Sequence, residues 1–300
     1  MKKKTYLFAL MAMALTLGSC SDNENGIGGE TSKYITVSTS IGNMTRVATD
    51  AKGGQTFEEG DEISVYAWTG APTVAPETSE RVVNNAINKL TNGTWVSTPQ
   101  MLWKNNREKH YFIGVYPTAA ISDLSAGEYT FDVNKQTESD LLVAVNPDGL
   151  SYSADAQQTV PLTFTHVMAK LAVNLTYKNQ WGGIPTVEKV VVGNAAKEAT
   201  INYLTKVVTP STTAKEDFSL PEITENTKYV SVIIPQEDVK QLTIVIGGKN
   251  FVYDNGTPFK LESGKITTVN LEVGRDEIKL GDVKITNWED GSTFSGEALN

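Results

Sequence analysis

Cysteine and histidine are scarce in this chain of 300 residues, which has one Cys and two His. A lone thiol cannot close an internal disulfide, and Cys20 is too isolated to build a metal site. The two histidines, His110 and His166, lie in unrelated contexts, and the chain has no HExxH, CxxC or Gly-rich phosphate motif. These absences argue against metal-dependent, thiol-redox and nucleotide-dependent enzymes. We therefore predict no catalytic residue, no metal and no cofactor.

Other signs of chemistry are equally sparse. The chain has no Gly-x-Ser-x-Gly elbow to present a serine, and His166 lies between two strand-like runs in "FTHVMAKL", where we expect a hydrogen-bonded structural role. Adjacent carboxylates such as Glu58 and Glu59 fall in loops, without the spacing of a glycosidase pair held about 5 to 9.5 Å apart. A sugar-binding platform and plain core or edge packing both remain open for the five tryptophans, which are Trp68, Trp95, Trp103, Trp181 and Trp288.

Long apolar runs are absent except near the start. Three lysines, Lys2 to Lys4, precede an apolar run from Tyr6 to Leu17 that is shorter than the roughly 20 residues a membrane span needs. This pattern predicts a secretory signal over residues 1–19. The following Leu17-Gly18-Ser19-Cys20 is typical of a bacterial lipoprotein box, which would make Cys20 the lipidation site and the first residue of the mature chain. The alternative is a signal peptide with an incidental cysteine.

Residues 20–33 are polar, acidic and glycine-rich, which favours a flexible tether. The stretch resembles the acidic signals of surface-exported lipoproteins in the Bacteroidetes, and a plain linker remains the alternative. Loss of the leader with its three lysines moves the formal charge from -9 to -12. Such an acidic protein is not expected to bind nucleic acid or to dock electrostatically on anionic lipid.

Alternation of apolar and polar residues with period two recurs along the chain and predicts β-strands. Turn signals such as Asn92-Gly93 and Asn255-Gly256 separate the runs. The evidence for helix is thin, and "SERVVNNAINKL" (79–90) fits a short helix or an irregular strand. A dozen or more short strands predict an all-β protein of two antiparallel β-sandwich domains, 34–166 and 167–300. The predicted strands are 34–42, 61–68, 110–117, 141–145, 160–164, 170–177, 187–193, 228–235, 242–248, 251–254, 265–273 and 283–286.

Several phrases, in this order, resemble the fimbrillin family of Bacteroidales, which comprises pilus subunits and their relatives. They are "MTRVATD", "FEEGDEISVYAW", "TWVSTPQMLWKNN", "YFIGVYP", "SDLLVAV", "VPLTFTHVMAKLAVNL", "YVSVIIPQ", "LESGKITTVNLEV" and "ITNWEDGS". Together they run from just beyond the lipoprotein box almost to the end of the sequence. The Phe-Thr-His-x-Met-Ala-Lys phrase is the most specific of them.

The resemblance implies two transthyretin-like β-sandwich domains and no enzymatic activity. It also implies export to the surface of the outer membrane, held by the lipid on Cys20, and trimming by an arginine-specific protease after Arg46 in "NMTRVATD". The polar, glycine-containing segment 49–55 just beyond Arg46 suits a protease-accessible loop. Trimming would remove one strand and leave an apolar groove with unpaired backbone groups. The apolar-face residues of that strand are Ile35, Val37, Thr39 and Ile41.

In the same scheme the groove is refilled by the C-terminal region of a neighbouring subunit, for which "IKLGDVKI" is the candidate. Its donor residues would be Ile278, Leu280, Val283 and Ile285; alternatively this strand stays in its own domain, as in a tip or anchor subunit. The implied partners are other fimbrial subunits in a homo- or hetero-polymer, the protease, and a ligand on a host or bacterial surface. The sequence thus predicts a stalk or tip subunit of a fimbria. The competing hypotheses are a monomeric glycan-binding surface lipoprotein and, third, a hydrolase.

Overall fold

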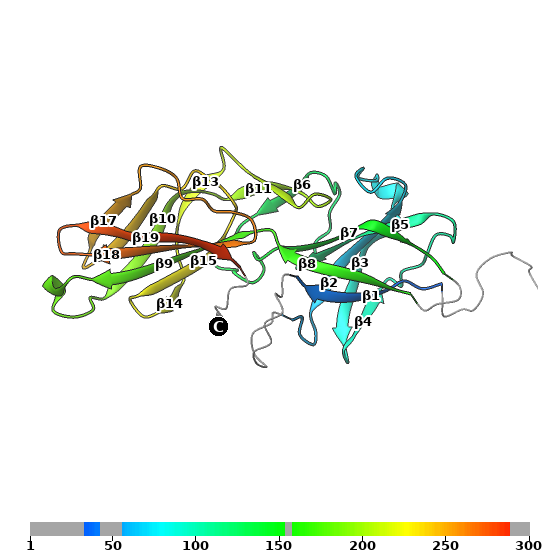
Figure 1. Ribbon diagram of the computed structural model, residues 1–300, viewed down its shortest axis with the longest axis horizontal. Helices are drawn as coiled ribbons and strands as arrows, with labels where there is room; N and C mark the ends of the chain where they lie inside the picture. The colour runs from blue at the N-terminus through cyan, green and yellow to red at the C-terminus, as the bar shows by residue number, and fades with distance from the viewer. Residues whose placement is uncertain (1–32, 43–55, 154–157, 289–300) are drawn as a thin grey trace, which may run out of the picture.

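The computed structural model describes residues 33–42, 56–153 and 158–288. Nearly all of their regular structure is β-strand, with two short 3-10 helices at Thr78–Glu80 and Asn179–Trp181. This confirms the all-β class. The strands form two lobes along the long axis, with β1 to β5, β7 and β8 in one and β9 to β19 in the other (Figure 1). No helix within the described ranges has the length and apolarity to cross a membrane.

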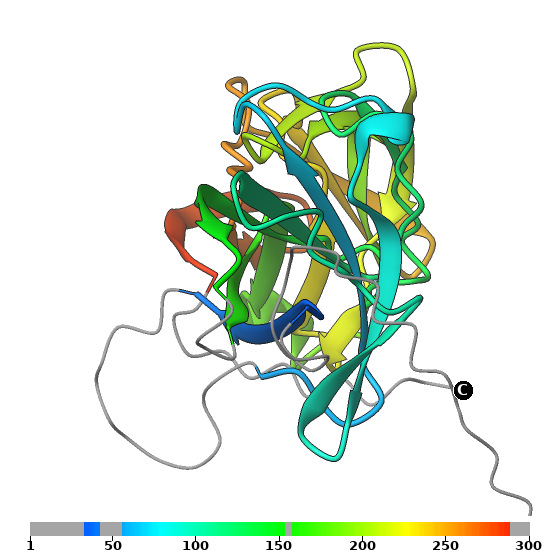
Figure 2. The same ribbon diagram turned by 90° about the vertical axis from the view of Figure 1, so that its right-hand side faces the viewer.

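The first lobe is built on one seven-stranded sheet with the order β1-β8-β7-β5-β2-β3-β4. Viewed end-on, the sheet curves, and β1 lies between the green strands and the cyan strands (Figure 2). The curvature brings the two edges of the sheet together. Two backbone hydrogen bonds join them: Ile35 N–H donates to Met101 O at 2.9 Å, and Trp103 N–H donates to Lys33 O at 3.2 Å. The strands are β1 (Thr36–Ile41), β2 (Glu62–Thr69), β3 (Val83–Thr91), β4 (Thr94–Thr98), β5 (Lys109–Tyr116), β7 (Leu142–Ser151) and β8 (Thr159–His166).

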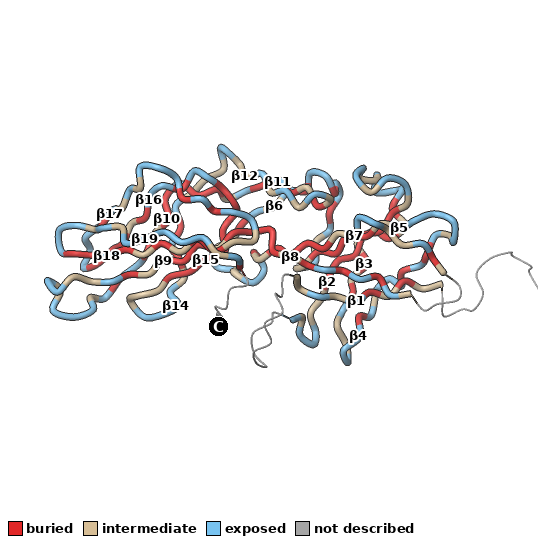
Figure 3. The backbone as a smooth tube through the Cα atoms, in the orientation of Figure 1, coloured by how far each residue is buried: buried red, intermediate tan, exposed pale blue. Residues whose placement is uncertain are grey.

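The middle strands of this sheet are buried on both faces. In β2, Ile63, Val65 and Ala67 face the core enclosed by the curved sheet, whereas Tyr66 and Trp68 pack into a second core that continues into the other lobe. Burial is therefore continuous along the strand, and buried segments run through the junction of the lobes (Figure 3).

The second lobe is a sandwich of a four-stranded sheet, β13-β10-β16-β17, and a five-stranded sheet, β14-β15-β9-β18-β19. A small sheet, β12-β11-β6, adjoins them. The bounds are β6 (Gly127–Thr130), β9 (Ala169–Tyr177), β10 (Val187–Ala196), β11 (Glu198–Asn202), β12 (Val207–Pro210), β13 (Lys215–Ser219), β14 (Glu222–Thr224), β15 (Lys228–Ile233), β16 (Gln241–Ile246), β17 (Lys249–Asp254), β18 (Lys265–Val273) and β19 (Ile278–Asn287).

One segment of the first half of the chain belongs to the second lobe. After β5 the chain crosses over, and β6 pairs antiparallel with β11. Arg81 holds this crossing by donating to Ile121 O at 2.6 Å, and Tyr66 accepts the Ile121 N–H at 2.9 Å. A domain boundary at residue 166 falls between β8 and β9. However, β6 precedes this boundary in the chain and pairs with β11, which follows it. The division into domains 34–166 and 167–300 therefore stays a proposal.

Two strand pairs are parallel, namely β1 with β8 and β9 with β18, whereas every other strand pair in the described ranges is antiparallel. Each parallel pair joins strands that are far apart in the chain, so no hairpin turn dictates their direction. The ambiguous stretch 79–90 forms a 3-10 turn followed by β3. Its irregularity lies at Asn85, which has φ 56°, where the pairing with β2 shifts register.

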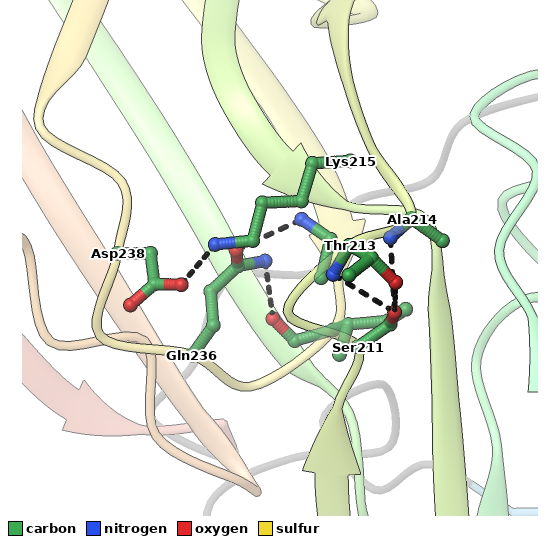
Figure 4. Close-up of polar contacts among 8 residues, drawn as sticks. Ser211, Thr213, Ala214, Lys215, Gln236 and Asp238 are labelled. Carbon is green, nitrogen blue, oxygen red and sulfur yellow. Dashed lines mark hydrogen bonds and ion pairs between the residues drawn. The ribbon is translucent and has the colours of Figure 1, made fainter.

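A buried glutamine braces the second lobe beside the small sheet. The side-chain amide of Gln236 accepts the Ala196 N–H at 2.9 Å and donates to Ile234 O at 2.9 Å, and the Lys215 ammonium next to it pairs with Asp238 (Figure 4). Buried polar backbone groups need hydrogen-bond partners. Gln236 provides them for two such groups, the Ala196 N–H and the Ile234 carbonyl oxygen. This gives the final residue of "YVSVIIPQ" a structural role.

Candidate functional site: the two terminal strands and the junction

The first strand, β1, has the alternation that the sequence predicts. Ile35 and Val37 are 2% and 6% exposed, and Thr39 and Ile41 on the same face are half-buried. One edge of β1 pairs with β8 from Thr36 to Ile41. The other edge faces an open cleft of about 390 Å³ whose far wall includes Phe57 and Trp95. The apolar face of β1 is thus only partly enclosed.

In the described part of the chain, hydrogen bonds hold the far side of β1 at two places. The Trp95 indole Nε1–H donates to Thr39 Oγ1 at 3.0 Å across the cleft. At the start of the strand, Lys33 to Ile35 pair with residues 101–103, and we name residues 101–104 the clasp. The clasp follows β4, so it belongs to the opposite edge of the sheet.

His110 contacts two residues of the clasp, Trp103 and Lys104. Its imidazole is fully buried, accepts the Lys104 N–H at Nε2 at 3.1 Å, and lies edge-on to the Trp103 ring with centroids 5.0 Å apart. Burial lowers the pKa of His110 from its usual 6.5, and the nearby Lys104 ammonium acts in the same direction, while Glu108 opposes both. The ring is therefore held neutral, as an acceptor must be. The sequence had suggested no role for this histidine.

Cys20, Arg46 and the segment 49–55 are outside the described residues. Among the described loop carboxylates, Glu59 accepts the Asn92 N–H at 2.7 Å and so supports the β3–β4 turn. It is therefore not simply a solvated charge. No cluster of metal-binding side chains occurs in the part of the chain that the structure describes.

The last strand, β19, is an edge strand that pairs only with β18 among the described strands. The four candidate donor residues pair with Val273, Leu271, Val269 and Thr267 in turn. These partners are alternate residues of β18, so all four donor residues lie on one face. Spacing alone would put Ile278 and Leu280 on the face opposite Val283 and Ile285. A register shift in β19 at Gly281 and Asp282 restores the parity.

Burial along β19 is uneven. Ile278 and Leu280 are half-buried and pack against the core, whereas Val283 and Ile285 are 40% and 38% exposed. The second half of the strand therefore contributes little to the core of its own lobe.

Beyond β19, four side chains meet at the junction of the lobes, and we name them the junction cluster: Asp140, His166, Lys170 and Trp288. His166 Nδ1 lies 2.7 Å from Asp140 Oδ1, and the imidazole stacks on the Trp288 ring with centroids 4.2 Å apart. Lys170 Nζ lies 4.2 Å from the centroid of the Trp288 ring. Burial lowers the pKa of Lys170, and Asp140 opposes that effect.

The hydrogen-bonded role expected for His166 is confirmed, but Asp140 and Lys170 had not been singled out. Asp140, His166 and Trp288 lie in three different phrases of the fimbrillin resemblance. Lys170 lies in the same phrase as His166. The phrases are "SDLLVAV", "FTHVMAKL" and "ITNWEDGS". Their convergence in space is the signal that the linear sequence hides.

The tryptophans do not form a sugar-binding platform. Trp68, Trp95, Trp103 and Trp288 are each at most 9% exposed. Stacking on a sugar needs an accessible ring face. The fifth, Trp181, is half-buried, donates to Val273 O at 2.9 Å, and has the Arg275 guanidinium 5.6 Å from the centroid of its ring. These rings serve packing instead.

A family model described as fimbrillin-like matches residues 45–288. Among solved structures, a proposed cell adhesion protein of Bacteroides uniformis has a TM-score of 0.63 at 19% identity, covering 85% of this chain and 99% of that one. A similar protein of Bacteroides ovatus has a TM-score of 0.62 at 18% identity, covering 85% and 98% of the two chains. A fimbrial protein of Bacteroides vulgatus has a TM-score of 0.52 at 13% identity, covering 85% and 99%. No curated protein sequence matches. At these identities the structures support the fold alone.

Proposed function

This chain belongs to the fimbrillin-like family of fimbrial structural and adhesion proteins, and we propose that it is a stalk or tip subunit that polymerises by protease-triggered strand exchange. The observation that carries the proposal is the setting of β1. This strand pairs with one neighbour along its length, has an open cleft on its other side, and buries Ile35 and Val37 in the core of the first lobe. Because β1 and β8 are distant in the chain, no hairpin joins them, and removal of β1 would leave a groove beside β8.

The proposed sequence of events begins at the outer membrane, where acylated Cys20 anchors the subunit. An arginine-specific protease then cuts after Arg46, and the fragment that contains β1 leaves. The β8 edge and the apolar floor of the groove become available to another strand, which is the general mode of recognition by β-strand addition.

The energetics set a condition on the incoming strand. Burial of Ile35 and Val37 is worth about 1.5 to 3 kcal/mol for each side chain. Ordering of a free strand costs about 1 to 2 kcal/mol per residue. Two buried side chains alone do not offset the ordering of the six residues of β1. The replacement must therefore also make the backbone hydrogen bonds to β8 and fill the positions of Thr39 and Ile41.

We propose β19 of a neighbouring subunit as the donor. Its four apolar side chains lie on one face because of the register shift at Gly281 and Asp282, and two of them are weakly buried at home. Filling of the groove would bury Val283 and Ile285 more fully than their own lobe does. This gain gives the exchange a direction.

The test compares three forms of the mature protein before and after an arginine-specific protease: wild type, Arg46→Ala and Arg107→Ala. Arg107 is an exposed arginine in a turn and is the matched control. We expect SDS-resistant ladders and fibres by electron microscopy for the wild type and for Arg107→Ala, and monomers for Arg46→Ala. Polymerisation of Arg46→Ala as readily as the wild type would overturn the mechanism.

The competing function, a monomeric glycan-binding lipoprotein, predicts binding to a glycan array without multimers under any protease treatment. The burial of Trp68 and Trp288 argues against it, since neither ring can stack on a sugar. Substitution of either residue would report on packing rather than on a ligand.

A further inference from the structure

The junction cluster buries the residue that follows β19 far more deeply than the second half of the strand is buried. Trp288 is 5% exposed, whereas Val283 and Ile285 are 40% and 38% exposed. On one face of the indole lies His166, whose ring is within 10° of parallel, and the Lys170 ammonium lies over the ring as well. A cation over an indole ring is attracted by its π-electrons, and this attraction strengthens as water is excluded.

The backbone reinforces this contact. Trp288 N–H donates to Gly264 O at 3.1 Å, and Gly264 N–H donates to Met168 O at 2.8 Å. Ser263 Oγ donates to Val167 O at 2.9 Å in the same connection. The residue that follows β19 is therefore tied to residues 166–168, which connect β8 to β9.

The contacts that hold Trp288 involve its ring and its backbone. Its indole Nε1 is buried, and none of the described residues accepts a hydrogen bond from it. The stacking, the cation and the backbone bond are therefore the contacts that retain the ring.

The opposite end of β19 has a tryptophan in a different setting. Trp181 packs at the β18–β19 turn, where its Nε1 donates to Val273 O at 2.9 Å. That contact lies on β18, so loss of Trp181 would disturb the turn without releasing residue 288. The chain thus supplies a matched control within the same pair of strands.

We propose that the junction cluster is a latch that keeps β19 in its own sheet, and that displacement of Trp288 from His166 and Lys170 makes β19 available to another subunit. This inference rests on the donor role proposed for β19. Because β19 has one neighbouring strand and a weakly buried second half, its retention depends on its ends. The latch therefore controls the release of β19, and Trp288 and His166 act as positioning residues for the donor strand.

The experiment measures hydrogen exchange of the uncut, full-length protein, so that it needs neither processing nor assembly. The variants are Trp288→Ala, Trp288→Phe, His166→Gln and the control Trp181→Ala. In Trp288→Ala and His166→Gln we expect the amides of residues 282–287 to exchange about tenfold faster or more, as for a local opening. The amides of β15 in the same sheet should keep their wild-type protection. Trp288→Phe, which keeps an aromatic ring over His166, should restore most of the protection.

The latch would be overturned by wild-type exchange of β19 in Trp288→Ala, or by equally faster exchange across β15, which indicates general destabilisation. Faster exchange of β19 in Trp181→Ala to the same extent would also overturn it, because the effect would not be specific to the junction. Failure of the proposed function has a different signature. In that case the latch variants open β19 as expected, but the protease-treated wild type forms no polymers.

Discussion

The indole of Trp95 and the hydroxyl of Thr39 form a hydrogen bond of 3.0 Å that joins β4 to β1 across the open side of the first lobe. It is a side-chain hydrogen bond that holds β1 from the cleft side. Within the described ranges, this bond and the clasp are the hydrogen-bonded contacts on that side of the strand that our proposal requires to leave.

Loss of the bond should loosen β1 locally. We expect Thr39→Val, which keeps the shape of the side chain, and Trp95→Phe each to cost about 0.5 to 1.5 kcal/mol. The effect should appear as faster hydrogen exchange of residues 36–41. The double variant should cost less than the sum of the two, and Ser38→Ala on the exposed face is the control. Additive effects in the double variant would show that the two side chains are not coupled.

Acid should weaken the clasp through His110. The folded protein holds the pKa of His110 below the usual 6.5 because the ring is buried. As pH falls, the unfolded chain binds the proton first, so the contribution of His110 to stability is present above about pH 6.5 and is lost as pH falls toward the folded pKa. Protonated His110 also cannot accept the Lys104 N–H.

This dependence is measured by urea unfolding at about pH 7.5 and about pH 5. Each tenfold difference in proton affinity between the folded and unfolded chains corresponds to about 1.4 kcal/mol of stability. His110→Gln should be less stable than the wild type at the higher pH and should lose less stability on acidification. An equal loss in the two proteins would assign the acid sensitivity to other groups.

Gly264 should not tolerate a side chain. Its φ is +67°, and a Cβ atom there would lie 3.1 Å from the carbonyl oxygen of His166. Gly256 has a similar φ of +69° but nothing within 4 Å, so Gly256→Ala isolates the cost of the backbone conformation. We expect Gly264→Ala to lower the free energy of unfolding by about 1 kcal/mol or more, and by more than Gly256→Ala does. Equal losses would mean that the junction adjusts to the added methyl group.

Cys20 should carry the lipid. Metabolic labelling with palmitate should mark the wild type, whereas Cys20→Ser should run as an unlabelled, uncleaved precursor. Lipid chains add about 0.8 kcal/mol per buried methylene, so the labelled, mature wild type should be found in the membrane fraction. Persistent labelling of Cys20→Ser would contradict the lipoprotein box.

Much of the local structure follows from the sequence. Period-two alternation places Ile35 and Val37 on the buried face of β1 and delimits β9 and β18 to within one residue. Such strands can be recognised from the local sequence, because successive side chains point to opposite faces of any extended backbone. Shorter strands such as β6, β12 and β14 escaped prediction because three or four residues hold too little pattern. The continuous burial of β2 could not be predicted either, because its two faces pack into two different cores.

What the sequence alone determined is therefore the β class, the main strands and a resemblance that the family match confirms. Only the tertiary structure decided that β1 runs parallel to β8, that β6 joins β11, and that a register shift aligns the apolar face of β19. It alone brought Asp140, His166 and Trp288 together. The physical reason is that strand periodicity is a property of neighbouring residues. Pairing partners, register and side-chain clusters depend instead on which distant segments bury each other's apolar faces.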